Sequence, residues 1–204
     1  MGFASHYFKR YGVSSTFLTT PGNYSPDIIV VVPVCNEPEL DQCIESLKLC
    51  NGYKSRILLL LVVNHSVLAN PEVKLTNSVT WHNINESVVG SDQGNFKIQG
   101  IFLQDLPKKT AGVGFARKTG MDEAIRIFNL CNNDSGLIVS LDADCRVSMN
   151  YFSAIEQYYH YNTLAEAAVI RFAHPVSGNV FTQEIYHSAC LYEIYLRYFK
   201  NALS

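Results

Sequence analysis

Runs of consecutive apolar residues alternate along the chain with segments in which apolar residues recur every three or four positions. The runs at 27–34 (DIIVVVPV) and 56–63 (RILLLLVV) are continuous, which is typical of strands covered on both faces. The segment 112–130 instead has the spacing of a helix with one apolar face. Strands that alternate with helices predict an α/β fold, with a Rossmann-like, mostly parallel sheet and helices on both faces.

The same pattern sets the expected elements. The stretch 70–99 is polar and predicts only one helix, near 72–82, followed by a loop rich in Gly, Ser and Asn. Pro, Gly and acidic residues mark the other helix starts. The expected strands are 27–34, 56–63, 101–103, 137–141 and 167–173, and the expected helices are 38–50, 72–82, 112–130, 149–161 and 182–203.

The length and the last helix bear on domain organisation. With 204 residues, 48% of them hydrophobic, the chain can bury one sizeable core, and we expect one domain over residues 1–204. The helix predicted at 182–203 carries aromatic residues on almost all sides, so it needs cover all round. We therefore expect the domain to be incomplete at its C-terminal side, or this helix to mediate self-association.

The net charge and the cysteine pattern limit which classes of partner and which cellular compartment we expect. The formal net charge is −2 without blocks of like charge, which argues against nucleic acid as a partner. The apolar run at 57–63 is too short to span a bilayer, and the start lacks the pattern of a signal peptide. Six cysteines without Cys-x-x-Cys spacing suggest reduced thiols. We expect a cytoplasmic chain, with any membrane association arising from a region outside this sequence.

Two aspartates follow the apolar run at 137–141. If the strand continues through them, alternation places Asp142 and Asp144 on one face, with the small Ala143 between them. Mg²⁺ and Mn²⁺ take oxygen ligands and often bind one or two carboxylates together with substrate phosphates. The pair therefore predicts a metal site for a nucleoside diphosphate. The alternative is a turn in which both acids are solvated or cap a helix.

Other polar segments follow the predicted strands or precede a helix. They are Pro33 to Glu37 after the first strand, Asn64 after the second, and the segment 108–117 before the third helix. Ligands of open parallel sheets bind beyond the carboxyl ends of the strands, where the connections reverse direction. These segments and the two aspartates are therefore predicted to line one cleft.

Three motifs occur in a recognisable order: Pro-x-x-Asn-Glu at 33–37, Gly-x-Gly-x-Ala-Arg at 112–117 and Asp-Ala-Asp at 142–144. Over roughly 27–152 the chain resembles the family 2 glycosyltransferases, which have the nucleotide-sugar-binding GT-A fold. The resemblance implies transfer of a sugar from a nucleoside-diphosphate donor to an acceptor hydroxyl, usually with inversion and with Mn²⁺ or Mg²⁺. The acceptor, whether glycan, lipid or protein, is left open.

The resemblance also implies roles for individual residues. Pro33, Cys35, Asn36, Glu37 and Asn64 would hold the nucleoside, Arg117 the diphosphate, Asp142 both donor and metal, and Asp144 the metal. Many relatives carry an acid in place of Asn64, an aromatic residue in place of Cys35 and an asparagine in place of Lys118.

Several of these side chains could instead have a purely structural role or simply be exposed to solvent. Glu37 is also placed to begin a helix, and Arg117 to lie on a solvated helical face. Lys108 and Lys109 either steer an anionic donor or are simply exposed.

The base that an inverting transfer needs is not evident. Relatives place this carboxylate on a helix well downstream of the aspartates, and only 60 residues follow Asp144. Glu184 is a weak candidate; Glu193, His187 and His174 have structural explanations. The base is therefore expected to be Glu184 or to lie outside this sequence.

Two other classes of function stay open. One is a donor-binding module without turnover, which a missing base would produce. The other is a nucleotidyltransferase, although such an enzyme should carry a Gly-rich, basic loop where this chain has residues 35–38 (CNEP).

Overall fold

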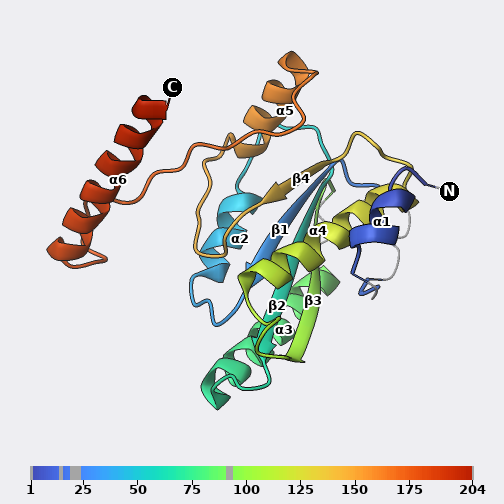
Figure 1. Cartoon of the computed structure of the whole chain (residues 1–204), viewed down its shortest axis with the longest axis horizontal. Coiled ribbons are helices and arrows are strands. Elements are labelled where there is room, and N and C mark those ends of the chain that lie inside the picture. Colours follow the sequence, from blue (N-terminus) through green and yellow to red (C-terminus); the bar gives the residue numbers. More distant parts are fainter. Residues whose placement is uncertain (1, 14–15, 19–23, 91–93, 204) are drawn as a thin grey trace. The chain divides into compact units, whose positions relative to one another are not determined.

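A computed structural model describes residues 2–13, 16–18, 24–90 and 94–203 (Figure 1). The chain divides into two compact units, Met1–Tyr161 and Asn162–Ser204. The first unit contains α1 (Ser5–Tyr11), β1 (Ile28–Val34), α2 (Leu40–Lys48), β2 (Ile57–Ser66), α3 (Pro71–Gly90), β3 (Phe96–Leu106), α4 (Val113–Leu130), β4 (Leu137–Ser140) and α5 (Tyr151–Tyr161); the second contains α6 (Gln183–Leu203).

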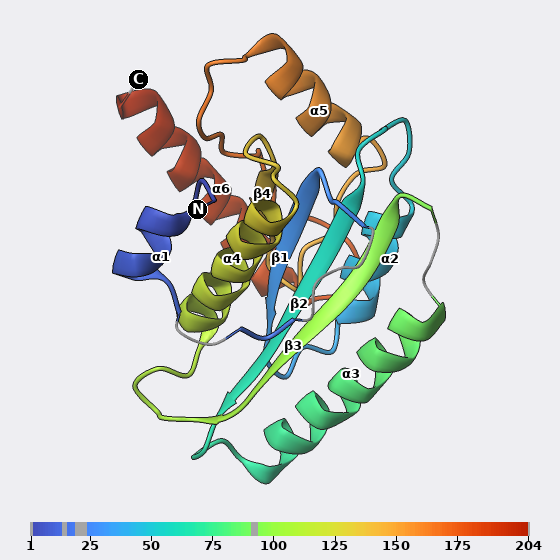
Figure 2. The same ribbon diagram turned by 90° about the vertical axis from the view of Figure 1, so that its right-hand side faces the viewer.

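The four strands form one sheet in the order β3-β2-β1-β4, and every pair is parallel (Figure 2). From β1 the chain moves outward to β2 and β3, and then crosses back to place β4 on the other side of β1. The predicted α/β class with a Rossmann-like parallel sheet is therefore confirmed. The direction of winding reverses between β1 and β4, and such a reversal opens a crevice at the carboxyl ends of the strands.

Both faces of the central strands are buried. Alternate residues of β1 and β2, such as Val30 and Leu59, pack with α2, α5 and Ile84 of α3 on one face. The intervening residues, such as Val31 and Leu60, pack against α4 on the other face. All seven residues of β1 are buried, which explains why its sequence is a continuous apolar run.

The third strand and the second of the predicted helices are longer than their patterns suggested. α3 continues to Gly90 because Trp81 and Ile84 pack against the face of β3 at Gly100, where a Cβ would lie 3.0 Å from Ile84 Cγ2. The loop expected after this helix includes residues 91–93, which lie outside the described part of the chain. α1 was not predicted at all.

The prediction of a fifth strand at 167–173 is wrong. Within the described residues of the second unit these residues pair with no strand, although their apolar, β-branched composition favours one. A strand needs a ladder partner, and the second unit offers only α6 as a regular element in the part of it that is described. No helix among the described residues is long and apolar enough to cross a bilayer.

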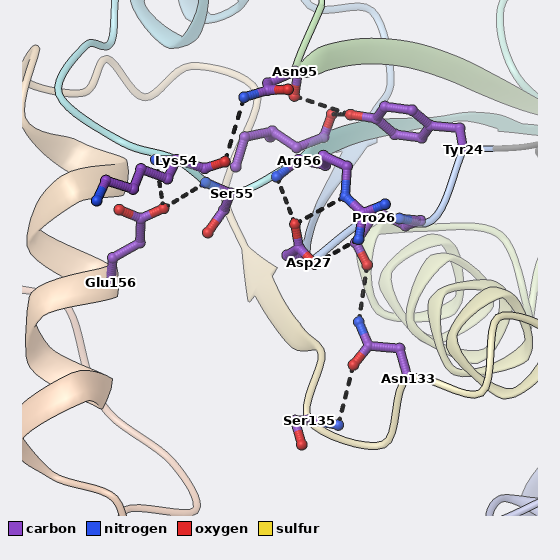
Figure 3. A network of polar contacts seen from close by, with 11 residues as sticks. Tyr24, Pro26, Asp27, Lys54, Ser55, Arg56, Asn95, Asn133, Ser135 and Glu156 are labelled. Atoms are coloured by element: carbon purple, nitrogen blue, oxygen red, sulfur yellow. Dashed lines mark hydrogen bonds and ion pairs between the residues drawn. The ribbon is translucent and has the colours of Figure 1, made fainter.

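A polar network holds together the amino ends of the strands (Figure 3). The Asp27 carboxylate accepts hydrogen bonds from Arg56 Nε at 3.1 Å, Nη2 at 3.0 Å and the backbone N–H at 2.8 Å. Burial alone would raise the pKa of Asp27, but these bonds lower it below its ordinary value. Asn133 Nδ2 donates to the Pro26 carbonyl at 2.9 Å. This end of the sheet is thus braced by bonds between its own loops.

Gly120 lets α4 approach the sheet, which generates a prediction. A Cβ here would lie 3.0 Å from Val62 Cγ2 and still closer to Val31 Cγ1, both of them buried. Gly120→Ala is expected to lower the free energy of unfolding by about 1–3 kcal/mol through overpacking. Urea denaturation followed by circular dichroism measures this change.

Gly114→Ala is the matched control on the same helix, because nothing lies within 4 Å of its added Cβ. It should be neutral or stabilise by up to about 1 kcal/mol. Equal destabilisation by both substitutions would contradict the close helix–sheet contact.

Candidate functional site

A hollow of about 380 Å³ lies at the carboxyl ends of β1 and β2, beside the turn after β4 and the start of α4. It therefore occupies the reversal point of the sheet, where open α/β sheets bind ligands. Every residue predicted to bind nucleotide or metal lines it, except Asn36. The full lining is Pro33, Val34, Cys35, Glu37, Asn64, Val113, Arg117, Asp142, Ala143 and Asp144.

Asp142 and Asp144 reach the hollow from a turn rather than from a strand. β4 ends at Ser140, and the Cys145 N–H donates to the Asp142 carbonyl at 3.1 Å. The buried Ala143 anchors the turn in the core, while both acids are exposed. The expected strand alternation through the aspartates is therefore wrong, and the turn brings both carboxylates to the same hollow.

Arg117 faces Asp142 across the hollow. It lies at the start of the second turn of α4, and its Nη2 donates to Asp142 Oδ1. Its Nε is buried and has no hydrogen-bond partner among the described residues. A guanidinium carries five N–H donors, so this ion pair leaves donors available for another anion. The solvated-face alternative for Arg117 does not describe this geometry.

The charges of the hollow are unbalanced. Glu37, Asp142 and Asp144 contribute three carboxylates, against one guanidinium from Arg117. An anionic ligand entering without a cation would meet a net negative surface. The hollow is therefore suited to an anion that arrives with a divalent cation.

The predicted metal ligands suit such a cation only in part. Among the described residues, no three His, Cys, Asp or Glu side chains come together as a metal-binding group. Mg²⁺ commonly takes one or two carboxylates from a protein, with substrate phosphates and water completing its coordination. Asp142 and Asp144 fit this arrangement if a phosphate-bearing ligand supplies the other oxygens.

Asn64 is buried, and its side chain joins two loops. Its Nδ2 donates to the Val34 carbonyl at 3.3 Å, and its Oδ1 accepts from the Gly112 N–H at 3.1 Å. Gly112 has φ +138°, in the region that favours glycine, and lies directly before α4. The amide expected to contact the base is thus already engaged with the end of β1 and the entry to α4.

The loop after β1 is held by a residue that the sequence did not reveal. Asn36 has φ +52°, and its backbone N–H donates to Oδ1 of Asn77 at 2.7 Å. Asn77 belongs to α3 and is fully buried. Its apolar helix neighbours Leu75 and Val79 are exposed, so apolar residues do not mark the buried face of this helix.

Glu37 is half-buried at the start of α2. Its Oε1 accepts from the Glu39 N–H at 3.1 Å, so the helix-start role holds for one carboxylate oxygen. Because Glu37 also lines the hollow, the two expected roles are compatible.

The lysines near these motifs do not line the hollow. Lys108 and Lys109 are exposed. Lys118 pairs with Asp122 and donates to the Tyr11 carbonyl at 2.8 Å. Arg117 is therefore the basic side chain that the described part of the chain places at this site.

Two buried acids on the outer side of α4 were also missed. Asp122 Oδ2 accepts from the Val13 N–H at 2.7 Å, and Glu123 Oε1 accepts from the Leu18 N–H at 2.8 Å. Glu123 also pairs with Arg126. These acids attach the N-terminal segment to the helix that carries Arg117. The backbone donors Val13 and Leu18 lie more than 100 residues away in sequence, a pairing that local patterns do not encode.

The candidate base and the late histidine lie in the second unit. Glu184 is exposed in the first turn of α6, where hydrogen bonds from its own backbone N–H and from Thr182 lower its pKa. This lowering makes it a weaker base at neutral pH. His174 Nδ1 lies 2.7 Å from Glu193 Oε1, a hydrogen-bonding contact within the same unit. This contact accords with structural roles for His174 and Glu193, while the role of Glu184 stays a prediction.

Comparison with solved structures finds a likeness to the crystal structure of S. aureus TarS 1–349. The match has a TM-score of 0.39 and 13% sequence identity, and it covers 67% of this chain and 33% of that chain. This chain thus spans about a third of the length of that structure. No family model matches the sequence. No curated protein is detectably similar to it.

The cysteines provide a chemical test of this geometry. Burial raises the pKa of the Cys43 thiol to about 12, with smaller contributions from Cys145, Asp144 and Glu37. Cys35 is exposed at the hollow. Since the thiolate is the nucleophile, iodoacetamide at pH 8 should modify Cys35 in the native protein and spare Cys43 until the protein unfolds. Peptide mass spectrometry measures both; equal native rates would contradict the placement.

Proposed function

We propose that the hollow binds a nucleoside-diphosphate sugar together with Mg²⁺ or Mn²⁺. The chain would then be the donor-binding part of a family 2-like glycosyltransferase with a GT-A-type domain. The acceptor hydroxyl, on a glycan, lipid or protein, receives the sugar with inversion. The observation that carries the proposal is the convergence of Asp142, Asp144 and Arg117 in one hollow at the reversal point of the sheet.

The phosphate end of the donor is assigned to α4 and the turn after β4. Asp142 and Asp144 would hold the cation, which when bound supplies Lewis-acid stabilisation of the departing diphosphate. Arg117 offers the terminal N–H donors of its guanidinium that Asp142 does not use to the phosphate oxygens. Among the residues that the structure describes, no side chain caps the first turn of α4, so its positive dipole end adds to this preference for an anion.

The nucleoside end is assigned to Pro33, Cys35, Asn36 and Glu37. Glu37 offers a carboxylate suited to ribose hydroxyls, and Asn36 shapes the backbone between the two neighbours that line the hollow. Asn64 contributes by fixing the loops around the base rather than by free side-chain contacts, since both ends of its amide are engaged.

A donor-binding module without turnover is the second candidate. It is favoured because each carboxylate of the hollow already has a partner or an assigned role other than that of a base: Glu37 accepts from the Glu39 N–H, Asp142 pairs with Arg117, and Asp144 is assigned to the cation. Assays that separate donor binding, donor hydrolysis and sugar transfer distinguish this candidate from an enzyme. A nucleotidyltransferase has less support, because residues 35–39 after β1 contain neither glycine nor a basic residue.

Replacing Asp144 tests the cation site. Asp144→Ala should weaken the Mn²⁺-dependent binding of a nucleoside diphosphate by on the order of tenfold or more, because one of two carboxylate ligands is lost. Isothermal titration calorimetry against a panel of nucleoside diphosphates, with Mn²⁺ or with EDTA, measures the change.

Asp134→Ala is the control for charge, because Asp134 is an exposed acid in the connection between α4 and β4, outside the hollow. It should bind like the parent. If Asp144→Ala also matched the parent, the metal assignment would be withdrawn.

Arg117→Gln should have opposite effects on two ligands. Nucleoside diphosphate binding is expected to fall by on the order of tenfold, because a charge-assisted contact is lost. Mn²⁺ binding without nucleotide should tighten by about threefold, because Asp142 no longer pairs with a guanidinium. Calorimetry and Mn²⁺ electron paramagnetic resonance read the two affinities.

Lys109→Gln removes an equal charge from the exposed loop nearby and serves as the control. A decrease in both affinities in Arg117→Gln, or no change in either, would show that Arg117 and the cation do not share Asp142.

A further inference from the structure

We propose that Asn77 is a positioning residue for the donor site, although it does not line the hollow. Together with Asn64 it forms a buried amide bridge that fixes the spacing between the nucleoside side and the phosphate side. This inference rests on the proposed function and adds a residue from α3, an element that no site motif includes.

The bridge consists of four hydrogen bonds in sequence. Asn36 N–H donates to Asn77 Oδ1 at 2.7 Å, and Asn77 Nδ2 donates to the Asn64 carbonyl at 2.9 Å. The Asn64 side chain then accepts from the Gly112 N–H at 3.1 Å and donates to the Val34 carbonyl at 3.3 Å. The loop after β1, the end of β2 and the entry to α4 are thereby joined.

The backbone conformation of Asn36 depends on this bridge, because Asn77 accepts the Asn36 N–H. Its φ of +52° is unfavourable for most side chains, and asparagine tolerates it at a small penalty. Asn36 sits between Cys35 and Glu37, which both line the hollow. Losing the acceptor on Asn77 would therefore release the backbone that aims these two residues.

The strand ladder does not fix this region by itself. The register between β2 and β3 shifts between Asn64 and Ser66, an irregularity that redirects side chains at strand ends. Asn77 Nδ2 also lies 3.4 Å from Nδ1 of the buried His65. Side-chain amides hold the site loops where the ladder is irregular.

Burial argues that Asn77 has more than a packing role. Its relative exposure is 0%, and a buried amide is costly unless its hydrogen bonds are satisfied. The buried side-chain amide of Asn77 is explained by its hydrogen bonds to Asn36 and Asn64, which join the loop after β1 to the end of β2.

The test uses Asn77→Leu in the full chain, with Asn133→Leu as the matched control. Asn133 joins loops at the opposite, amino end of the sheet, where its side-chain Nδ2 donates a hydrogen bond to the Pro26 carbonyl at 2.9 Å. Both substitutions should lower thermal stability. Well below either melting temperature, only Asn77→Leu should weaken nucleoside diphosphate binding, by roughly tenfold, as for other supporting residues around a site.

Two further readouts separate positioning from general destabilisation. Mn²⁺ affinity without nucleotide should be unchanged in Asn77→Leu, because the turn with Asp142 and Asp144 is not part of the bridge. The backbone amide NMR signals of Asn36 and Gly112 should shift in Asn77→Leu and not in Asn133→Leu. If Asn77→Leu does not fold, Asn77→Ala removes the same two hydrogen bonds and leaves room for water at the Asn36 N–H and the Asn64 carbonyl, and it should show the same selective loss of nucleotide affinity.

Parent-like nucleotide affinity in the folded Asn77 variant would overturn the inference, as would equal losses in both asparagine variants. A parent protein that binds no nucleoside diphosphate would instead refute the proposed function. In that event the Asn36 and Gly112 signals still decide whether the bridge exists.

Discussion

The structure depends on the burial of β1 between two parallel neighbours and between two helical layers. Because β2 and β4 both run parallel to β1, their carboxyl ends emerge at the same edge of the sheet. Residues about 80 positions apart in sequence, such as Asn64 and Asp142, can then line one hollow. The apolar core sets this arrangement, and the polar loops only have to complete it.

The hollow itself is an arrangement of opposite charges held close together. Arg117 and Asp142 form an ion pair, while Asp144 and Glu37 do not take part in that pair. A partly exposed ion pair of this kind contributes little to stability, so it can be exchanged for other partners without loss of the fold. The residues whose burial stabilises the fold are therefore different from the charged residues that would contact a ligand.

The sequence predicted what depends on repeating patterns. Continuous apolar runs identified β1 and β2, helical spacing identified α4, and the parallel order implied that Arg117 and the aspartates would meet. It failed where a single tertiary contact decides. The strand 167–173 lacked a ladder partner, the aspartates lay on a turn anchored by Ala143, and α3 extended because it packs on β3. Asn77 was invisible because a buried amide has no periodic signature, and its partners lie on other elements.

Two acids of α4 that do not line the hollow connect the N-terminal segment to the helix that carries Arg117. Asp122 and Glu123 are buried, and part of their hydrogen bonding comes from the backbone of the first eighteen residues. Trimming those residues would remove the backbone N–H donors of Val13 and Leu18 and open both carboxylates to water, with Lys118 and Arg126 as their remaining partners. Expression variants that shorten or tag the beginning of the chain would therefore change how α4, the helix that presents Arg117, is held on the side away from the hollow.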